Sequence, residues 1–231
     1  MVSIPCSGCK RECSAEFAGT YLLVLFGAGS VIVSSFIKGF FALVFVAGIF
    51  GGTVALVILL LGKHSGAHIN PAVTIAHALA KRTRNELVLP YICFQALGAV
   101  VGALTLRIFF LSQTVFPADL GSTELALGVT PLYGIILEAL GTFALCSSAL
   151  MATFYVRKPS RQAVLVGGTL FVLILLIGNL TGASFNPARS IGPAVSSDHW
   201  SNILVYLIGP FLGAVCAALP FRLNNNRKDW C

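Results

Sequence analysis

Charged residues are scarce in this sequence, at 10% of 231 residues, whereas hydrophobic residues make up 57%. The mean hydropathy is correspondingly high, at +0.90. Because soluble domains carry roughly 25% charged residues, this scarcity excludes an ordinary water-soluble globule. The composition predicts a protein that lies within a lipid bilayer.

Catalytic and nucleic-acid-binding patterns are also absent. The sequence has no nucleophile paired with a base, no phosphate-binding glycine loop and no histidine-rich metal set, which disfavours a membrane enzyme. The net charge of +7 comes from cations spread over the ends of apolar stretches rather than gathered on one soluble face. We therefore expect no enzymatic activity, no cofactor, no metal and no nucleic-acid partner.

A disulfide framework is not expected, because the seven cysteines are an odd number. Three of them lie inside apolar stretches, namely Cys93, Cys146 and Cys216. Cys6, Cys9 and Cys13 have ligand-like spacing, and Cys231 could approach them from the other terminus. We interpret these thiols as structural, with a metal or redox site as the alternative.

Long apolar stretches occur six times, each near the roughly 20 residues that a helix needs to cross a bilayer core. They cover about 13–35, 39–62, 87–111, 131–155, 163–180 and 202–222. The first lacks a small-residue cleavage site followed by a polar sequence, so we expect a retained span rather than a signal peptide. The sequence predicts an all-α membrane protein with six transmembrane helices.

Basic residues gather on one side if these six helices alternate in direction. They are Lys10 and Arg11; Lys81, Arg82 and Arg84; Arg157, Lys158 and Arg161; and Arg222, Arg227 and Lys228. The opposite loops carry Lys38 and otherwise mainly Asp119, Glu124 and Asp198. Cytoplasmic loops are enriched in Lys and Arg, so we expect both termini, with short tails at 1–12 and 223–231, to be cytoplasmic, in the cell membrane.

The chain contains two similar halves within a single domain, 1–231. AEFAGTYLL from residue 15 parallels LEALGTFAL from residue 137, and ALGAVVGA from residue 96 parallels FLGAVCAA from residue 211. Each half, about 10–111 and 131–222, holds three spans. An odd number of spans makes the second half enter the membrane from the opposite side, so the halves are predicted to be inverted repeats.

A polar motif is repeated about 116 residues apart, as SGAHINPAVTIA from residue 65 and TGASFNPARSIG from residue 181. Proline is best tolerated in the first turn of a helix, and asparagine is a preferred N-cap. Pro71 and Pro187 therefore predict short helices at about 71–81 and 187–196. At 1.5 Å per residue each is roughly 15 Å long, half a membrane span.

Two half-helices that enter from opposite faces and meet at their N-termini would together cross the membrane. Their irregular lead-ins, 65–69 and 181–185, are tolerated at that depth only where they line a cavity. We expect them to offer carbonyl acceptors along a narrow pore. Positive helix ends and the amides of Asn70 and Asn186 would lie at its midplane and repel cations.

Through SGAHINPAVT, TGASFNPARS, AEF and LEALGT, the sequence resembles the aquaporin (major intrinsic protein) family over nearly its full length. The resemblance implies a passive channel for water and small uncharged solutes such as glycerol, assembled as a homotetramer in the bilayer. Pores of this type exclude protons and ions with an arginine or half-helix dipoles. The implied pore motifs are Asn70, Pro71 and Ala72, with Asn186, Pro187 and Ala188.

The resemblance also implies a selectivity filter at Phe50, Ile174, Ala183 and Arg189. An unpaired charge at the depth of Arg189 costs at least a few kcal/mol, which favours a functional role for it. Strict water channels usually carry histidine at the position of Ile174. Ile174 with the small Ala183 therefore predicts a wider, more apolar lining that admits glycerol-sized solutes.

Other markers of the family are mixed. Glycerol facilitators usually have Asp and Lys where this chain has Ser190 and Ala194, and Trp in place of Phe50. Tyr206 resembles the water-channel pattern and Leu207 the glycerol pattern. The mixture is similar to nodulin-like intrinsic proteins and some prokaryotic aquaporins, so the physiological solute stays open.

Two acids, Glu16 and Glu138, occupy equivalent positions inside predicted spans. Intramembrane carboxylates are candidates for proton coupling, which makes a proton-coupled secondary transporter the main alternative, with a nonconducting scaffold protein as a third possibility. The resemblance implies instead that each carboxylate, together with His68, supports the pore. A pH gate through His64, His68 or His77 is a further alternative.

Overall fold

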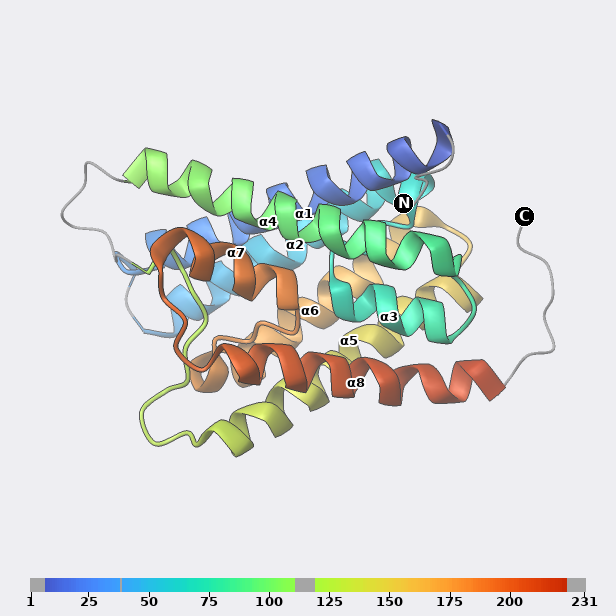
Figure 1. The fold of residues 1–231 in the computed structure, drawn as a ribbon. Coiled ribbons are helices and arrows are strands. Elements are labelled where there is room, and N and C mark those ends of the chain that lie inside the picture. Colours follow the sequence, from blue (N-terminus) through green and yellow to red (C-terminus); the bar gives the residue numbers. More distant parts are fainter. Residues whose placement is uncertain (1–6, 38, 111–118, 224–231) are drawn as a thin grey trace.

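The computed structural model describes residues 7–37, 39–110 and 119–223, and the regular elements in this part of the chain are all helices (Figure 1). The helices are α1 (Ser7–Ser34), α2 (Phe40–Ser65), α3 (Pro71–Leu79), α4 (Asn85–Phe110), α5 (Pro131–Tyr155), α6 (Pro159–Thr181), α7 (Pro187–Ser197) and α8 (Ile203–Leu223). All but α3 and α7 are long and apolar enough to cross a membrane. The predicted six-span fold is confirmed.

The observed helix bounds differ from the predicted ones mainly at the start of the chain. Helix α1 begins at Ser7, so it extends into the stretch that we predicted to be a tail. The short helices begin at the two predicted prolines and end at Leu79 and Ser197. The predicted tail residues 1–6 and 224–231, and Lys38, lie outside the described residues.

The cysteine cluster is only partly described, because Cys6 and Cys231 lie outside the described residues. Cys9 and Cys13 are free and lie buried on α1 beside Leu87 and Tyr91 of α4. Among the residues that the structure describes, no group of three or more His, Cys, Asp or Glu side chains could hold a metal ion. The described thiols therefore pack as apolar side chains.

The helices pair in the same way in the two halves of the chain. Helix α1 packs against α4, as α5 does against α8, and α2 packs against α6 to join the halves. Each short helix lies on the other half, since α3 packs against α8 and α7 against α4. Figure 1 shows α3 and α7 running outward in opposite directions from the middle of the bundle.

Helices α2 and α6 approach so closely that their backbones are in contact, with no side chain between them. A Cβ atom added to Gly51 would meet the carbonyl oxygen of Gly167, and one added to Gly167 would meet that of Gly51. Membrane helices lack a hydrophobic driving force for association in lipid, so such close packing of small residues holds them together. The neighbours Gly52 and Gly168 face open space instead.

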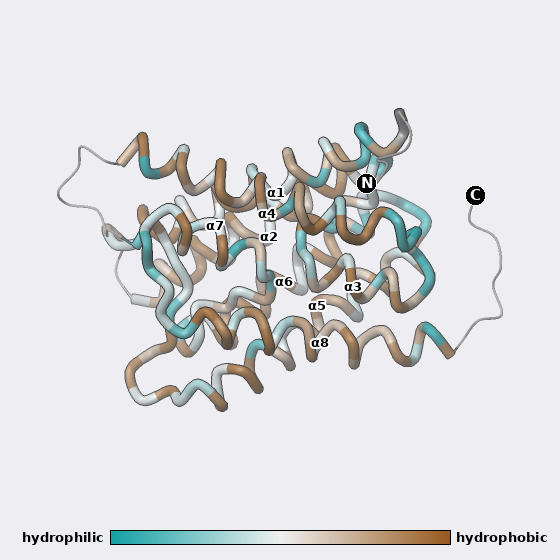
Figure 2. Tube along the Cα trace, in the orientation of Figure 1, coloured by the Kyte–Doolittle hydropathy of each residue, from teal (hydrophilic) through white to brown (hydrophobic). Residues whose placement is uncertain are grey.

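The two ends of the bundle differ in charge. Helix α1 begins and α8 ends at one end, which we name the terminal end, and the opposite one is the far end (Figure 1). Figure 2 shows apolar colour along the long helices and polar colour gathered at their ends. The helix ends and connections at the terminal end carry Lys10, Arg11, Lys63, Lys81, Arg82, Arg84, Arg157, Lys158, Arg161 and Arg222.

Candidate pore

Both short helices begin at the predicted asparagine caps. The Oδ1 atom of Asn70 accepts a hydrogen bond from the Ala72 N–H at 2.8 Å, and that of Asn186 accepts one from the Ala188 N–H at 3.0 Å. Proline follows each cap, where its missing N–H leaves no helical bond unmade. The caps hold the positive ends of both helices toward the middle of the bundle.

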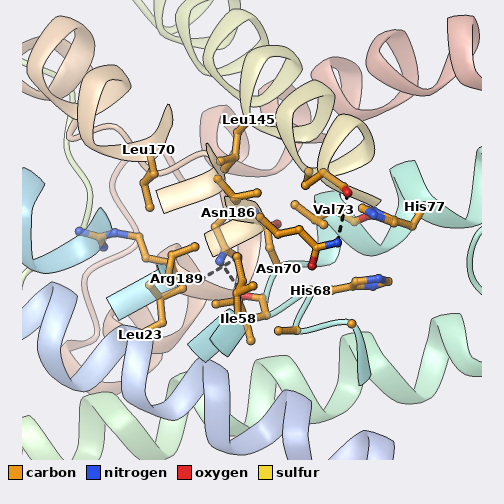
Figure 3. A pocket seen from close by; sticks show the side chains of 18 of the residues that line it. Leu23, Ile58, His68, Asn70, Val73, His77, Leu145, Leu170, Asn186 and Arg189 are labelled. Atoms are coloured by element: carbon orange, nitrogen blue, oxygen red, sulfur yellow. Dashed lines mark hydrogen bonds between the residues drawn. The ribbon is translucent and has the colours of Figure 1, made fainter. Parts of the chain in front are cut away.

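The two caps are joined to each other across the chain. The Nδ2 atom of Asn70 donates to the Phe185 carbonyl at 2.8 Å, and that of Asn186 donates to the Ile69 carbonyl at 2.9 Å. Figure 3 shows the two asparagines side by side in the pocket. An amide nitrogen carries two hydrogens, so each asparagine retains a second donor after this bond.

The lead-in segments adopt a backbone that ordinary residues avoid. Ala67 and Ile69 have φ values of 50° and 45°, and Ala183 and Phe185 have 45° and 51°. A positive φ is rare outside glycine, and in the β-branched Ile69 it is strained. Such a conformation persists only where its surroundings fix it, and here two buried carboxylates do so.

Glu16 of α1 holds the first lead-in. Its Oε1 atom accepts from the Ser65 hydroxyl at 2.6 Å and the His68 N–H at 2.9 Å. Its Oε2 atom accepts from the Ile69 N–H at 2.6 Å and the Gln95 amide at 2.7 Å. Four donors around one fully buried side chain fit the ionised carboxylate, since a protonated carboxyl would have to donate.

Glu138 of α5 repeats this arrangement in the second half. Its Oε1 atom accepts from the Thr181 hydroxyl at 2.7 Å and the Ser184 N–H at 3.0 Å. Its Oε2 atom accepts from the Phe185 N–H at 2.7 Å. The two predicted acids therefore bind the backbone that precedes each motif.

Several residues play roles in this framework that the sequence analysis missed. The Tyr91 hydroxyl donates to the Ser65 carbonyl at 3.0 Å, and the Tyr206 hydroxyl donates to the Thr181 carbonyl at 2.9 Å. Gln95 links Glu16 to Thr74. The two tyrosines stand about 115 residues apart, nearly the spacing of the twin motifs, so the repeat itself could have revealed them.

Arg189 lies in the first turn of α7 with only 2% of its side chain exposed. Its Nη1 atom donates to the Gly121 carbonyl at 3.0 Å, and its guanidinium carbon lies 5.2 Å from the centre of the Phe50 ring. Its Nε–H has no hydrogen-bond partner within the described residues. Folded proteins leave few buried donors unpaired, so this nitrogen sets Arg189 apart from an ordinary packed side chain.

Ser190 stands where glycerol facilitators have an acid, and it takes part in a chain of hydroxyls. The Thr123 hydroxyl donates to Ser190 at 2.9 Å, and Ser190 lies 2.6 Å from the Ser184 hydroxyl. Ser184 donates in turn to the Asn186 carbonyl at 2.9 Å. The loop that carries Gly121 and Thr123 is thus bound to α7 at two adjacent residues.

One cavity of about 80 Å³ connects these groups, several times the volume that one water needs on this measure. It reaches from Phe50 and Arg189, past the two asparagines, to Thr153 and Gln162 near the terminal end. Apolar side chains complete its wall. They include Leu23, Val54, Ile58, Leu145, Ala149, Val166 and Leu170.

Only two of the four predicted filter residues line this cavity. Phe50 and Arg189 line it, whereas Ile174 and Ala183, both buried, are not among its lining residues. Of the histidines considered for gating, His68 and His77 line the cavity and His64 does not. In Figure 3, Arg189 and the two histidines lie on opposite sides of the asparagine pair.

Comparison with known proteins gives concordant matches. The sequence model of the family described as "Major intrinsic protein" matches residues 4–221. Aquaporin AqpM of Methanothermobacter marburgensis is 34% identical, over 92% of this chain and 96% of the archaeal one. Aquaporin NIP1-1 of Zea mays is 35% identical, over 90% of this chain and 73% of the maize protein.

A solved structure has the same fold. The aquaglyceroporin from Plasmodium falciparum superimposes with a TM-score of 0.85 and covers 93% of this chain and 96% of its own. The two sequences are 23% identical, so the likeness concerns the arrangement of the helices.

Proposed function

The chain belongs to the major intrinsic protein family, and on that basis we propose that it is a passive channel for water and small uncharged solutes such as glycerol. The observation that carries the proposal is the pair of reciprocally bonded asparagine caps inside a cavity that also contains Arg189. The relatives named aquaporin support the class of permeant. This class of protein transports its solutes without chemical conversion, so the chain is a channel rather than an enzyme.

Selection against ions follows from the charges around the cavity. Two helix N-termini and the Arg189 guanidinium place positive potential on the path, which raises the energy of a cation there. The free amide hydrogens of Asn70 and Asn186 donate to a permeating oxygen. A water held as acceptor at that point has its own hydrogens turned away, which interrupts a chain of proton transfers.

We assign the breadth of the path to the filter that the sequence predicts, Phe50, Ile174, Ala183 and Arg189, of which Phe50 and Arg189 line the cavity and the other two lie outside its lining. Arg189 donates to hydroxyl or water oxygens, and Phe50 offers an apolar surface opposite it. An isoleucine at position 174 supplies no polar contact and leaves more room than a histidine that reaches into the path. Glu16, Glu138 and His68 support this pore by fixing the two lead-in segments.

The orientation and assembly are part of the same proposal. The terminal end, where basic residues gather, faces the cytoplasm, and both chain termini lie there. The segments 10–111 and 131–222 act as inverted repeats of one channel domain, in the cell membrane, with four copies of the chain per assembly and a pore in each. The mass of the purified complex in lipid discs tests the fourfold assembly.

The experiment that tests the function is stopped-flow light scattering on proteoliposomes. The chain should accelerate shrinkage in an impermeant osmolyte and re-swelling in glycerol, each relative to empty liposomes. In Ile174→His the glycerol re-swelling should be lost while fast shrinkage persists, because the imidazole narrows the path. Fast shrinkage without glycerol influx in the wild type would refute the solute range, and unchanged shrinkage would refute the channel.

Proton coupling provides the second arm of this experiment. A channel moves solute down its gradient at the same rate with or without a proton gradient. Concentrative uptake that depends on a proton gradient would replace the channel with the transporter alternative. The hydrogen bonds of Glu16 and Glu138 favour the channel, because their oxygens are occupied by backbone and side-chain donors.

A further inference from the structure

A second polar group lines the cavity between the asparagine pair and the terminal end. His77 lies in the last turn of α3, only 4% exposed, and its ring lines the cavity with His68, Thr153 and Gln162. Four segments contribute to this group, since His68 lies in the first lead-in, Thr153 on α5 and Gln162 on α6. The other side chains around it are apolar, so these are the polar side chains of this stretch of the path.

The hydrogen bonds of His77 define its protons. Its Nδ1 atom lies 3.0 Å from the Val73 carbonyl, which can only accept, so Nδ1 carries a hydrogen. Its Nε2 atom lies 3.1 Å from the Thr153 hydroxyl, and that hydroxyl donates to the Ala149 carbonyl at 3.0 Å. In the neutral ring Nε2 therefore carries no hydrogen and accepts, and the Thr153 hydroxyl donates either to Nε2 or to the Ala149 carbonyl.

The Thr153 hydroxyl can turn between these two acceptors at little cost in free energy. The bond from Thr153 to Ala149 is a hydroxyl-to-carbonyl bond within one helix, and such bonds are dispensable because the helix keeps its own N–H···O=C bond. Thr153 is exposed, so a molecule in the cavity can reach its hydroxyl. His77 and Thr153 can thus present either a donor or an acceptor, unlike the Asn70, Asn186 and Arg189 nitrogens, which only donate.

His68 is fixed, by contrast. Its Nδ1 atom lies 3.2 Å from the Thr74 hydroxyl, and that hydroxyl donates its hydrogen to the Asn70 carbonyl at 3.1 Å. Nδ1 of His68 therefore donates, and its ring is held 4.5 Å from that of His77 and edge-on to Tyr91. The nearby charges are Glu16, which accepts from the His68 N–H, and Arg82, which stacks on Phe154.

We propose that His77 is a specificity-determining residue, which with Thr153 forms a second hydrogen-bonding station for hydroxyl-bearing, uncharged solutes on the terminal side of the asparagine pair. The inference rests on the proposed channel function. A polyol that has left most of its hydration water behind needs both donors and acceptors along its path. The station supplies them from side chains in a stretch whose other side chains are apolar, and so favours polyols over apolar solutes of equal size.

The test compares the glycerol and water permeabilities of proteoliposomes for four single variants and one double variant. His77→Leu keeps a side chain of similar length without nitrogen atoms, His77→Gln restores a donor and an acceptor, and Thr153→Val replaces the hydroxyl with a methyl group. His64→Leu is the matched control, because His64 is half-buried at the end of α2 and does not line the cavity. Size-exclusion profiles establish that each variant is folded and assembled.

The ratio of glycerol to water permeability should fall roughly twofold to tenfold in His77→Leu, the range for one lost hydrogen bond. It should fall in Thr153→Val, recover in His77→Gln and stay unchanged in His64→Leu. The double variant of His77→Leu with Thr153→Val should be no worse than His77→Leu alone, because both remove the same station. A folded His77→Leu protein with the wild-type ratio overturns the inference.

Failure of the inference and failure of the channel proposal remain distinct. If the wild type passes water but not glycerol, the solute station is refuted while a water channel stands. If the wild type accelerates neither flux, both are refuted. If His77→Leu and His64→Leu lower the ratio equally, the effect does not arise from the cavity and the inference fails.

Discussion

At the scale of single residues, the buried carboxylates show how a charge can be kept inside a membrane protein. Glu16 receives four hydrogen bonds and Glu138 three, two of them in each case from backbone N–H groups of a lead-in. Those N–H groups belong to strained segments that form no regular secondary structure, so the carboxylate replaces the helix as their acceptor. The acid and the strained loop each require the other.

Replacement of Glu138 by Gln should therefore destabilise the protein and slow the channel. The Gln side chain has one acceptor oxygen, so a donor among Thr181, Ser184 and Phe185 is left facing an NH₂ group, at a cost of about 1–3 kcal/mol. Thermal unfolding in detergent and osmotic permeability measure the two effects. Glu86→Gln, at an exposed acid in α4, is the control; equal melting temperatures for the two variants would contradict this role.

At the scale of elements, each short helix depends on one asparagine for two tasks. The Oδ1 atom caps the helix, and the Nδ2 atom bonds the lead-in of the opposite half. The tasks can be separated, because serine caps a helix without offering an amide. Substitutions at Asn70 can therefore test the stability of α3 separately from the bond that joins the two half-helices.

Asn70→Ser should retain the cap and lose the bond to Phe185, whereas Asn70→Ala should lose both. Loss of a cap costs about 0.5–2 kcal/mol, so the alanine variant should unfold at a lower temperature than the serine variant. Both should conduct water more slowly than the wild type, because the free amide donor is removed in each. Identical unfolding temperatures for the two variants would show that the cap does not stabilise α3.

At the scale of the whole molecule, the halves are joined through α2 and α6 and through the exchange of the short helices. The Gly51–Gly167 approach sets the spacing between α2 and α6, and both helices contribute residues to the cavity wall. A side chain there would push against backbone rather than against a flexible side chain. The width of the cavity is therefore coupled to the packing of the halves.

Gly167→Val should lower stability by about 1–3 kcal/mol or prevent assembly, as overpacking of a close-packed interface does. Gly168→Val, one residue along the same helix, should fold and conduct normally because nothing lies near the added methyl groups. Size-exclusion chromatography and stopped-flow shrinkage compare the two variants. Normal assembly and conduction in Gly167→Val would contradict the close approach of the helices.

The sequence by itself determined the six long helices and the starts of the two short ones. These features depend on local chemistry: apolar length decides which segments can cross a bilayer, and an Asn-Pro pair decides where a helix begins. The repeat of the motif also indicated that the two short helices are equivalent. Their starts and the roles of Asn70 and Asn186 as caps were accordingly predicted correctly, and their ends to within two residues.

Only the tertiary structure decided which residues meet. The bond from Asn70 to Phe185 and the meeting of His77 with Thr153 join residues on different elements, and helix packing sets their distances. The same packing brings Phe50 and Arg189 to the cavity wall and leaves Ile174 and Ala183 outside its lining. Local sequence patterns determine where a helix begins and ends. Which side chains face one another across the bundle depends instead on how all of its helices pack.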